Sequence, residues 1–373
     1  MEYLLDQLLN GLSLGCIYAF IALGYTMVYG IIKLINFAHG EFFMVGAFAG
    51  YFVLSAAGIE AIGLPEPLPM ILAFGIAMLA AALSSGVLAV IVERLAYRPL
   101  MGSSRIAALL TALGVSLFLQ NVGIQVFSAE QRGYPEARRY IDLDDAADYV
   151  GQTFPGLAYA TFTVTSPTGK DSEVREILAG PDKALTADAV AELKYKKDAD
   201  GEPVGGFYVS SPFSHTAKTL IVIVSLALSF GLLWLLVHRT QFGRAMRAVS
   251  YNPEAAKLMG IQSTRVISMT FFVGAFLAGI GGIIWGMRYG KIEPFMGFMP
   301  GLKAFIAAVI GGIGSIPGAV FGGILLGVLE VLIPAYLPSE YSGYKDAVAF
   351  IALIAILLYR PQGLFGRFEG EKV

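Results

Sequence analysis

His39 and two acidic residues stand out because ionisable side chains are unexpected in a sequence this apolar. His39 and Glu41, in the stretch INFAHGE, could transfer a proton or bind a metal ion. Residues two apart on a helix do not face each other, however, and no second His or Cys lies nearby in the sequence. We therefore predict a turn in which Asn36 caps and Gly40 bends the chain.

The second acidic residue, Glu330, has apolar sequence on both sides, in LGVLEVLIPAY. Because removing a carboxylate from water inside a membrane is costly, such a residue is a candidate for a translocation path. Its expected place near the outer end of a helix offers a second interpretation, in which the carboxylate reaches interfacial water. Three amides are predicted to form interhelical hydrogen bonds, with substrate contacts as the alternative: Gln120, Asn121 and Gln125.

The other reactive residue types do not suggest an enzyme. The three histidines, His39, His215 and His238, are scattered, and no Ser/His/Asp or Cys/His set supports a hydrolase. The single cysteine, Cys16, lies in an apolar run, which excludes an internal disulfide and favours a small core residue. The sequence lacks a G-x-x-x-x-G-K-[ST] loop, so we do not expect the chain to hydrolyse ATP. No cofactor and no metal are predicted.

Composition shows that the elements carrying these residues are helices in lipid. The 373 residues are 56% hydrophobic and 14% charged, and the mean hydropathy is +0.68. A soluble domain is far less apolar, so the sequence predicts an all-α polytopic membrane protein. The net charge of -2 provides no basic field for nucleic acid.

Uncharged stretches long enough to cross a bilayer, roughly 18 residues or more, are found at 7–32, 42–59, 68–92, 106–128, 219–237 and 266–287. A further apolar region, 304–337, is interrupted by GSIPG, and we predict a broken pair of half-length or tilted helices there. A last, short stretch covers 347–359. Eight or nine membrane-embedded helices are expected in total.

Lys and Arg in the short loops indicate the orientation. They are frequent around Lys33, at 93–105, at 238–265 and in the C-terminal tail, and sparse in the intervening segments. By the positive-inside rule the first group is cytoplasmic, which makes the N-terminus periplasmic and the C-terminus cytoplasmic. The segment 288–303 is thereby assigned to an outer loop.

Three parts are predicted along the chain. Residues 1–128 are N-terminal transmembrane helices, 129–215 are a small extracytoplasmic insertion, and 216–373 are C-terminal transmembrane helices that include the cytoplasmic loop 238–265. Within the insertion, AYATFTVTS alternates as a strand does, and ADAVAELKYKK is typical of a helix. A solvated hairpin and a docking site are both open interpretations of this insertion.

Small residues recur at intervals of four in several predicted spans. Gly11 pairs with Gly15, Gly318 with Gly322, and Gly323 with Gly327. Such spacing lets helix backbones approach closely, because helices in lipid associate through close packing more than through the hydrophobic effect. These crossings are expected either within the chain or with a second subunit.

The stretch NPEAAKLMGIQ, in the predicted cytoplasmic loop, has the signals of a short helix at 253–259. Asn252 is a good N-cap, Pro253 suits the first position, and Gly260 ends the helix. So short a helix is unstable alone and must pack on something. Leu258, Met259 and Ile261 offer an apolar face, framed by Arg244, Arg247 and Arg265. Docking into a partner's groove and lying on the membrane surface are the two alternatives.

EAAKLMG, at 254–260, matches the E-A-A-x-x-x-G core of the cytoplasmic coupling loop in permease subunits of bacterial ABC importers, although the I-x-L-P that often follows is absent. Longer stretches extend the likeness: NGLSLGCIYAFIALGYTMVYGIIKLINFAHGEFFMVGAF, YRPLMGSSRIAALLTALGVSLFLQN, KAFIAAVIGGIGSIPGAVFGG and PQGLFG. Together they resemble the LivH-type permease of branched-chain amino-acid importers over nearly the whole chain. The insertion at 129–215 is longer than is usual in that family.

The resemblance implies a transport subunit of the bacterial inner membrane that imports branched-chain amino acids with energy from a separate ATPase. Its implied partners are a second, LivM-like permease, two ATP-binding subunits and a periplasmic substrate-binding protein. The residues implied in ATPase coupling are Arg244, Arg247, Glu254, Ala255, Ala256 and Gly260. The family pattern also implies a cytoplasmic gate or an ATPase contact at Asn36, His39 and Glu41. A urea or amide importer, and a secondary transporter or channel without an ATPase, are the alternatives.

Overall fold

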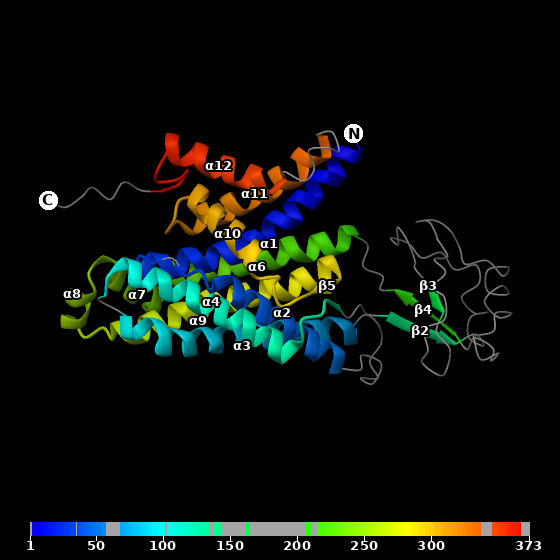
Figure 1. Cartoon of the computed structure of the whole chain (residues 1–373), viewed down its shortest axis with the longest axis horizontal. Helices are drawn as coiled ribbons and strands as arrows, with labels where there is room; N and C mark the ends of the chain where they lie inside the picture. Colours follow the sequence, from blue (N-terminus) through cyan, green and yellow to red (C-terminus); the bar gives the residue numbers. More distant parts are fainter. Residues whose placement is uncertain are drawn as a thin grey trace. The chain divides into compact units, whose positions relative to one another are not determined.

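The computed structural model describes residues 2–34, 36–56, 68–100, 103–134, 138–142, 162–164, 206–210, 215–336 and 345–366. The chain divides into two compact units, one formed by Met1–Pro135 with Ile221–Val373 and the other by Glu136–Leu220. The first unit is a bundle of helices, and the second contains a small sheet (Figure 1).

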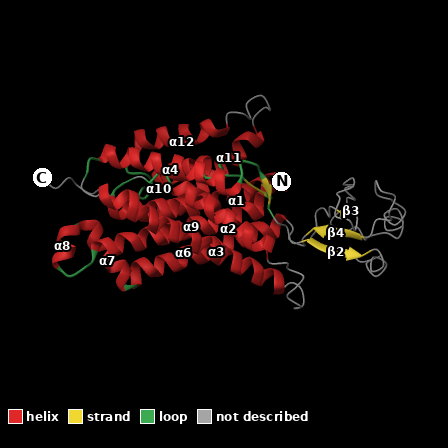
Figure 2. Cartoon of the chain, turned by 60° about the horizontal axis from the view of Figure 1, so that its bottom comes forward, coloured by secondary structure: helices red, strands yellow, loops and turns green. Residues whose placement is uncertain are grey.

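Helices account for most of the described chain (Figure 2). Within the described residues, six helices are long and apolar enough to cross a membrane, and α10 is a shorter apolar helix. The all-α polytopic fold expected from the sequence is confirmed. The bounds are α1 Glu2–Ile32, α2 His39–Ala56, α3 Leu68–Val92, α4 Arg105–Phe127, α6 His215–Arg239, α7 Gln241–Tyr251, α8 Pro253–Leu258, α9 Ser263–Tyr289, α10 Phe298–Gly311, α11 Ile316–Tyr336 and α12 Lys345–Tyr359.

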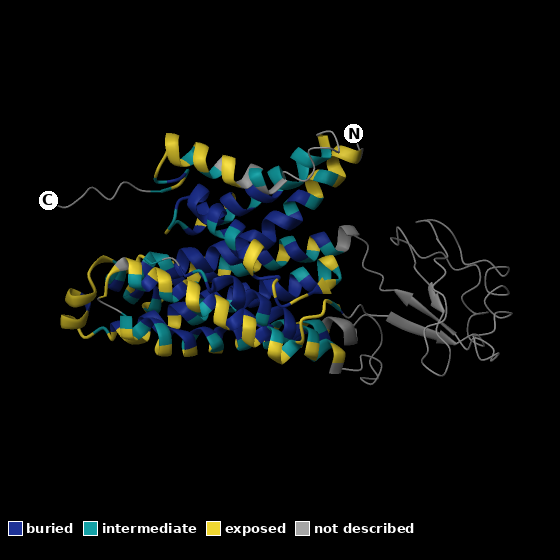
Figure 3. Ribbon diagram, viewed as in Figure 1, coloured by how far each residue is buried: buried dark blue, intermediate teal, exposed yellow. Residues whose placement is uncertain are grey.

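Helix α9 is the central helix of the first unit, packed against α1, α2 and α3, and its residues are largely buried (Figure 3). Glycines permit these contacts because a side chain would collide with the neighbouring backbone. A Cβ on Gly279 would overlap Ala81 of α3, and one on Gly327 of α11 would overlap the backbone of Gly15 in α1. The crossings predicted from the glycine spacing therefore occur within this chain.

The break predicted in 304–337 is confirmed, since α10 ends at Gly311 and α11 begins at Ile316. Gly312 and Gly314 have φ values of 101° and 94°, in the region that favours glycine. The assignment of 288–303 to an outer loop is wrong at its end, because α10 begins at Phe298. Lys303 lies inside this helix and is buried, which is possible because a carboxylate from α11 neutralises its charge.

Short strands complete each unit. In the first, β1 (Arg132–Gly133) pairs antiparallel with β5 (Lys291–Ile292) and joins the ends of α4 and α9. Next to this pair, burial raises the pKa of the Tyr134 phenol above its usual value. In the second unit, β2 (Arg138–Asp142), β4 (Gly206–Ser210) and β3 (Phe162–Val164) form an antiparallel sheet in the order β2-β4-β3. The strand predicted in AYATFTVTS contains β3, and the predicted helix ADAVAELKYKK lies outside the described residues.

Helix α7 was not predicted from the sequence, which indicated a single short helix in the loop 238–265. Its buried residues, Gly243, Met246 and Val249, are three apart and face the bundle, while Arg244 and Arg247 are exposed. Helices α7 and α8 lie at one end of the first unit, and β5 lies at the other (Figure 1).

Candidate functional site

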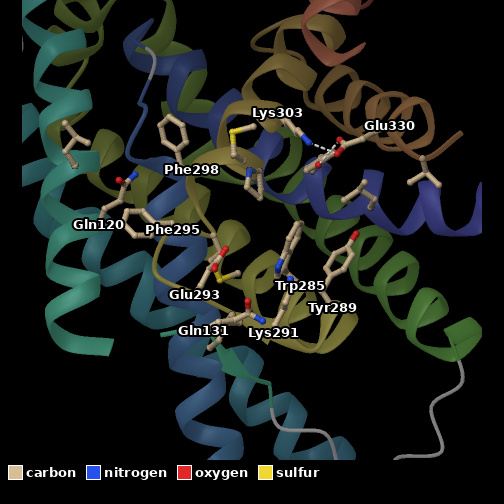
Figure 4. A pocket seen from close by; sticks show the side chains of 18 residues that line it. Gln120, Gln131, Trp285, Tyr289, Lys291, Glu293, Phe295, Phe298, Lys303 and Glu330 are labelled. Carbon is tan, nitrogen blue, oxygen red and sulfur yellow. Dashed lines mark hydrogen bonds and ion pairs between the residues drawn. The ribbon is translucent and has the colours of Figure 1, made fainter. Parts of the chain in front are cut away.

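A cavity of about 770 Å³ lies where α1, α4, α9, α10 and α11 meet the segment between α9 and α10 (Figure 4). Its volume is within the range of small-molecule sites. The wall is mostly apolar and aromatic, with Trp285 and Tyr289 from α9, Phe295 from the following segment and Phe298 from the start of α10. Because these residues come from distant parts of the sequence, only the folded chain forms the cavity.

The polar side of this cavity is an ion pair between helices α10 and α11. Lys303 Nζ lies 2.5 Å from Glu330 Oε1, and the two side chains are 7% and 10% exposed. The hydroxyl of Tyr18, on α1, donates a hydrogen bond of 2.8 Å to Glu330 Oε2. Glu330 thus lies in the cavity wall, which fits the translocation-path interpretation. Sequence reasoning missed Lys303, although the apolar run on both sides of it was a usable signal.

Two further charged residues line the exposed edge of the cavity. Lys291, in β5, and Glu293, which follows it, are both solvent-exposed. Exposed charges are well solvated and interact weakly at physiological salt. The cavity therefore has a hydrated edge with charges of both signs and a buried pair deeper in its wall.

The start of α2 is built around Asn36. Its Oδ1 accepts hydrogen bonds from the backbone N–H of Ala38 at 3.1 Å and from the hydroxyl of Tyr97 at 2.6 Å. The predicted turn is therefore present, and Asn36 closes it just before α2 begins. The predicted bend at Gly40 is wrong, because α2 already begins at His39 and continues through Gly40. A side chain at Gly40 would collide with the carbonyl of Gly297, so close packing explains the glycine.

His39 and Glu41 point to different partners, as their spacing predicted. The His39 ring contacts the Tyr25 ring, with centroids 4.8 Å apart. Glu41 Oε1 accepts hydrogen bonds from the Ser116 hydroxyl at 3.0 Å and from Gln120 Nε2 at 2.8 Å. Within the described residues, no group of three His, Cys, Asp or Glu could hold a metal ion.

The contact of Glu41 with α4 places a buried carboxyl directly behind the cavity wall, because Gln120 itself lines the cavity. The interhelical hydrogen bond predicted for Gln120 is confirmed. For Asn121 the prediction is wrong, since its amide donates to the Leu117 carbonyl of its own helix. Gln125 is exposed.

A second polar cluster, missed from the sequence, joins the turns that follow α3 to α9. Arg98 donates to both carboxylate oxygens of Glu93, at 3.0 and 2.9 Å, and Ser268 donates to Glu93 at 2.7 Å. Residues 93–97 form a π-helical turn, η2, followed by the 3₁₀ turn η3 at 98–100. In a π-helix residues five apart are aligned, which brings Arg98 over Glu93. The Glu-x-x-x-x-Arg spacing was the available signal.

Helix α8 has the cap and the end predicted for it. Asn252 Oδ1 accepts hydrogen bonds of 3.0 Å from the backbone N–H groups of Glu254 and Ala255. Gly260 follows with a φ of 80°, a conformation that favours glycine. The side chains of Leu258 and Met259 are 89% and 82% exposed. Such exposed apolar side chains beside a helix end are available to a partner or to lipid.

The inner side of α8 is fixed to the bundle. Ala256 is buried, and its carbonyl accepts the N–H of Ile261 at 3.0 Å. The hydroxyl of Ser263, the first residue of α9, donates to the Pro253 carbonyl at 3.2 Å. Ala255, in contrast, is exposed on the outer side of the helix. The Arg247 guanidinium donates to the Val237 carbonyl at the end of α6, and Arg244 is exposed.

Helix α9 connects α8 with the cavity. Its first residue contacts α8, and Trp285 and Tyr289 near its other end line the cavity. With 27 residues, α9 is about 40 Å long at 1.5 Å per residue. A displacement of α8 can therefore reach the cavity through one continuous helix.

A bundle of helices long enough to cross a membrane, with a cavity between them and a capped helix at one end, is an architecture that suits a membrane permease. Comparison with known proteins agrees: the family described as branched-chain amino acid transport system / permease component matches residues 7–357. This chain belongs to that family.

The relatives are similar over their full length. The high-affinity branched-chain amino acid transport system permease protein LivH of Salmonella typhimurium is 36% identical, over 100% of this chain and 98% of the relative. LivH of Escherichia coli is also 36% identical with the same coverage. BraD of Pseudomonas aeruginosa, a permease protein of the same description, is 36% identical over 99% of this chain and 98% of the relative. No solved structure matches the chain.

Proposed function

We propose that this permease component belongs to an ATP-driven importer of branched-chain or related amino acids and is coupled to a separate ATPase through α8. The observation that carries the proposal is the structure of α8. Its inner side is fixed to α9, while Leu258 and Met259 are exposed on its outer side. A short helix with apolar side chains presented beside arginines is suited to a groove in a partner protein.

In the proposed mechanism, closure of the ATPase on ATP moves α8, and α9 carries the movement to the cavity. The Glu93–Arg98–Ser268 cluster holds α9 against α3 and the turns that follow it, so α9 moves together with that layer. Trp285 and Tyr289 move with the far end of α9 and change the cavity wall. Rigid-body displacement of packed helices is a common basis of such switching.

The orientation follows from this role and from the distribution of Lys and Arg. The α7–α8 end faces the cytoplasm, the N-terminus is periplasmic and the C-terminus is cytoplasmic, in a bacterial inner membrane. The proposed partners are a second, LivM-like permease, two ATP-binding subunits and a periplasmic substrate-binding protein. The remaining exposed apolar helix faces contact membrane lipid.

Cross-linking tests the docking of α8. Cys16 is buried, so a thiol added at the exposed positions Ala255→Cys or Lys257→Cys is the accessible one. We expect a bifunctional maleimide to join either variant to the ATP-binding subunit in native membranes. Lys291→Cys, exposed at the β5 end, is the matched control and should not be joined. Absence of the product at both α8 positions would refute the proposal.

Uncoupling variants test the function of the same helix. Glu254→Lys places a cation in the first turn, where the helix dipole disfavours it. Gly260→Pro requires a φ near -65° at a position where φ is 80°. We expect both variants to insert into membranes but to lose ATP-dependent uptake, with Glu254→Gln retaining most of it. Uptake that survives ATP depletion and collapses with an ion gradient would instead identify a secondary transporter.

A further inference from the structure

We propose that the Lys303–Glu330 ion pair, with Tyr18, is a binding site for the zwitterionic main chain of an amino acid in the cavity. The proposal rests on the proposed function for the class of ligand. Helices α10, α11 and α1 each contribute one of these side chains, and all three side chains line the cavity. Figure 4 shows the pair at the cavity wall, with Trp285 and Tyr289 nearby.

Folding alone gives no reason for charges at this place. A buried ion pair stabilises a protein little, because the cost of dehydrating both ions offsets their attraction, and apolar residues of similar size often serve as well. Here both side chains are about nine-tenths buried, yet they border a space large enough for a small molecule. Charges in that position are available to a ligand.

An amino acid complements this pair in charge and in arrangement. Its carboxylate and ammonium groups are attached to one carbon, so they can meet Lys303 and Glu330 at the same time. The Tyr18 hydroxyl, which donates to Glu330 Oε2 at 2.8 Å, keeps that carboxylate oriented. The pair and the zwitterion are each neutral overall, so no net charge enters the apolar cavity on binding.

The remaining wall suits an aliphatic side chain. Trp285, Phe295 and Phe298 provide apolar surface, and Met296 and Met299 provide flexible side chains that adapt to different branched shapes. A rigid pocket would distinguish leucine from isoleucine, whereas this lining accepts both. The geometry points to strong recognition of the main chain and loose recognition of the side chain.

Tryptophan fluorescence gives a direct test. The chain has two tryptophans, and only Trp285 lines the cavity, so the Trp234→Phe background makes Trp285 the single reporter. The full-length chain in proteoliposomes is titrated with leucine and isoleucine. It is then titrated with leucinamide, which lacks the carboxylate, and with 4-methyl-2-oxopentanoate, which lacks the ammonium group.

We expect saturable changes in Trp285 emission with both amino acids, and apparent affinities about tenfold lower for each analogue, since each loses a charge-assisted hydrogen bond. The double variant Lys303→Met/Glu330→Gln should weaken leucine binding at least about tenfold. The control, Glu93→Gln/Arg98→Met, removes an ion pair outside the cavity, in which Glu93 is buried and Arg98 is partly exposed. It should change leucine binding by less than about twofold.

Equal affinity for leucine and leucinamide, or the absence of a saturable response to leucine, would overturn the inference without use of any variant. Unchanged leucine binding in the double variant would do the same. If ATP-dependent uptake is present but leucine and leucinamide bind with equal affinity, the proposed site is wrong and the importer proposal stands. Absence of ATP-dependent uptake in a chain whose Trp285 still distinguishes leucine from leucinamide would count against the importer proposal and support the site.

Discussion

The two ends of α9 differ in how their functional features are built. At one end, α8 comes from a single stretch, 252–260, and exposes apolar side chains on its outer surface. At the other, the cavity takes its wall from five helices and the segment between α9 and α10, and it buries an ion pair. A helix that docks to a partner is specified locally, whereas a cavity wall needs the whole bundle.

The same difference predicts how substitutions act at each end. Residues in the cavity wall hold the helices of this chain together, so their replacement should lower the free energy of unfolding. The outer residues of α8, Leu258 and Met259, are exposed and make little contact with the rest of the chain. Their replacement should therefore leave folding intact and change coupling to the ATPase. Four substitutions, from the largest expected effect on stability to the smallest, test this contrast.

The largest effect is expected for Lys303→Met. It leaves the Glu330 carboxylate buried without this cation, and breaking one partner of a buried pair typically costs about 3–5 kcal/mol. Adding Glu330→Gln should recover most of the loss, because no buried charge then remains at the pair. Thermal unfolding in detergent micelles measures both. Equal destabilisation of the single and double variants would show that packing, not charge, is what Lys303 contributes.

A smaller loss is expected for Gly327→Ala, one turn from Glu330 on α11. Its Cβ would overlap the backbone of Gly15, and such overpacking costs about 1–3 kcal/mol. Gly114→Ala in α4 is the matched control, because apart from its chain neighbours and the nearby backbone of its own helix no atom lies within 4 Å of the added Cβ. The control should be neutral or gain up to about 1 kcal/mol in the same unfolding assay. Equal behaviour of the two variants would contradict the tight crossing of α1 and α11.

Sequence reasoning succeeded where a feature is local. The predicted stretch 68–92 is α3, and Asn252, Pro253 and Gly260 marked the limits of α8. It failed where the outcome depends on a distant partner. Lys303 was assigned to a loop because the carboxylate that neutralises it is 27 residues away.

Helix α7 was missed although its signals are local. The Thr240 side chain accepts the N–H of Gly243 as an N-cap, and the buried residues Gly243, Met246 and Val249 recur at intervals of three. The cluster of Glu93, Arg98 and Ser268, in contrast, depends on a π-helical turn and on α9, which lies 170 residues further along the chain. The spacing of Glu93 and Arg98 is visible in the local pattern, but their partner Ser268 is not.

At the α8 end, Asn252→Ala should have a modest effect. It removes the side-chain oxygen that accepts the N–H groups of Glu254 and Ala255, and loss of such a cap costs about 1 kcal/mol. Because α8 is short, the cost falls on local order, so hydrogen exchange of the α8 amides should rise while global unfolding changes little. Asn252→Asp retains an acceptor and should restore protection. Unchanged exchange in the alanine variant would show that packing of Ala256 alone holds α8.

The smallest effect on stability is expected for Leu258→Ser. Leu258 is 89% exposed, so the free energy of unfolding should change by less than about 0.5 kcal/mol. Affinity for the ATP-binding subunit should nevertheless fall about tenfold, because a central apolar contact of an interface typically contributes more than 1 kcal/mol. Titration of the purified ATP-binding subunit onto the permease measures this, with Gln262→Ser, exposed and polar, as the control. Unchanged affinity in Leu258→Ser would place the outer face of α8 against lipid instead of a partner. The two ends of α9 would then differ only in how far their side chains are exposed, and not in having a partner protein at one end.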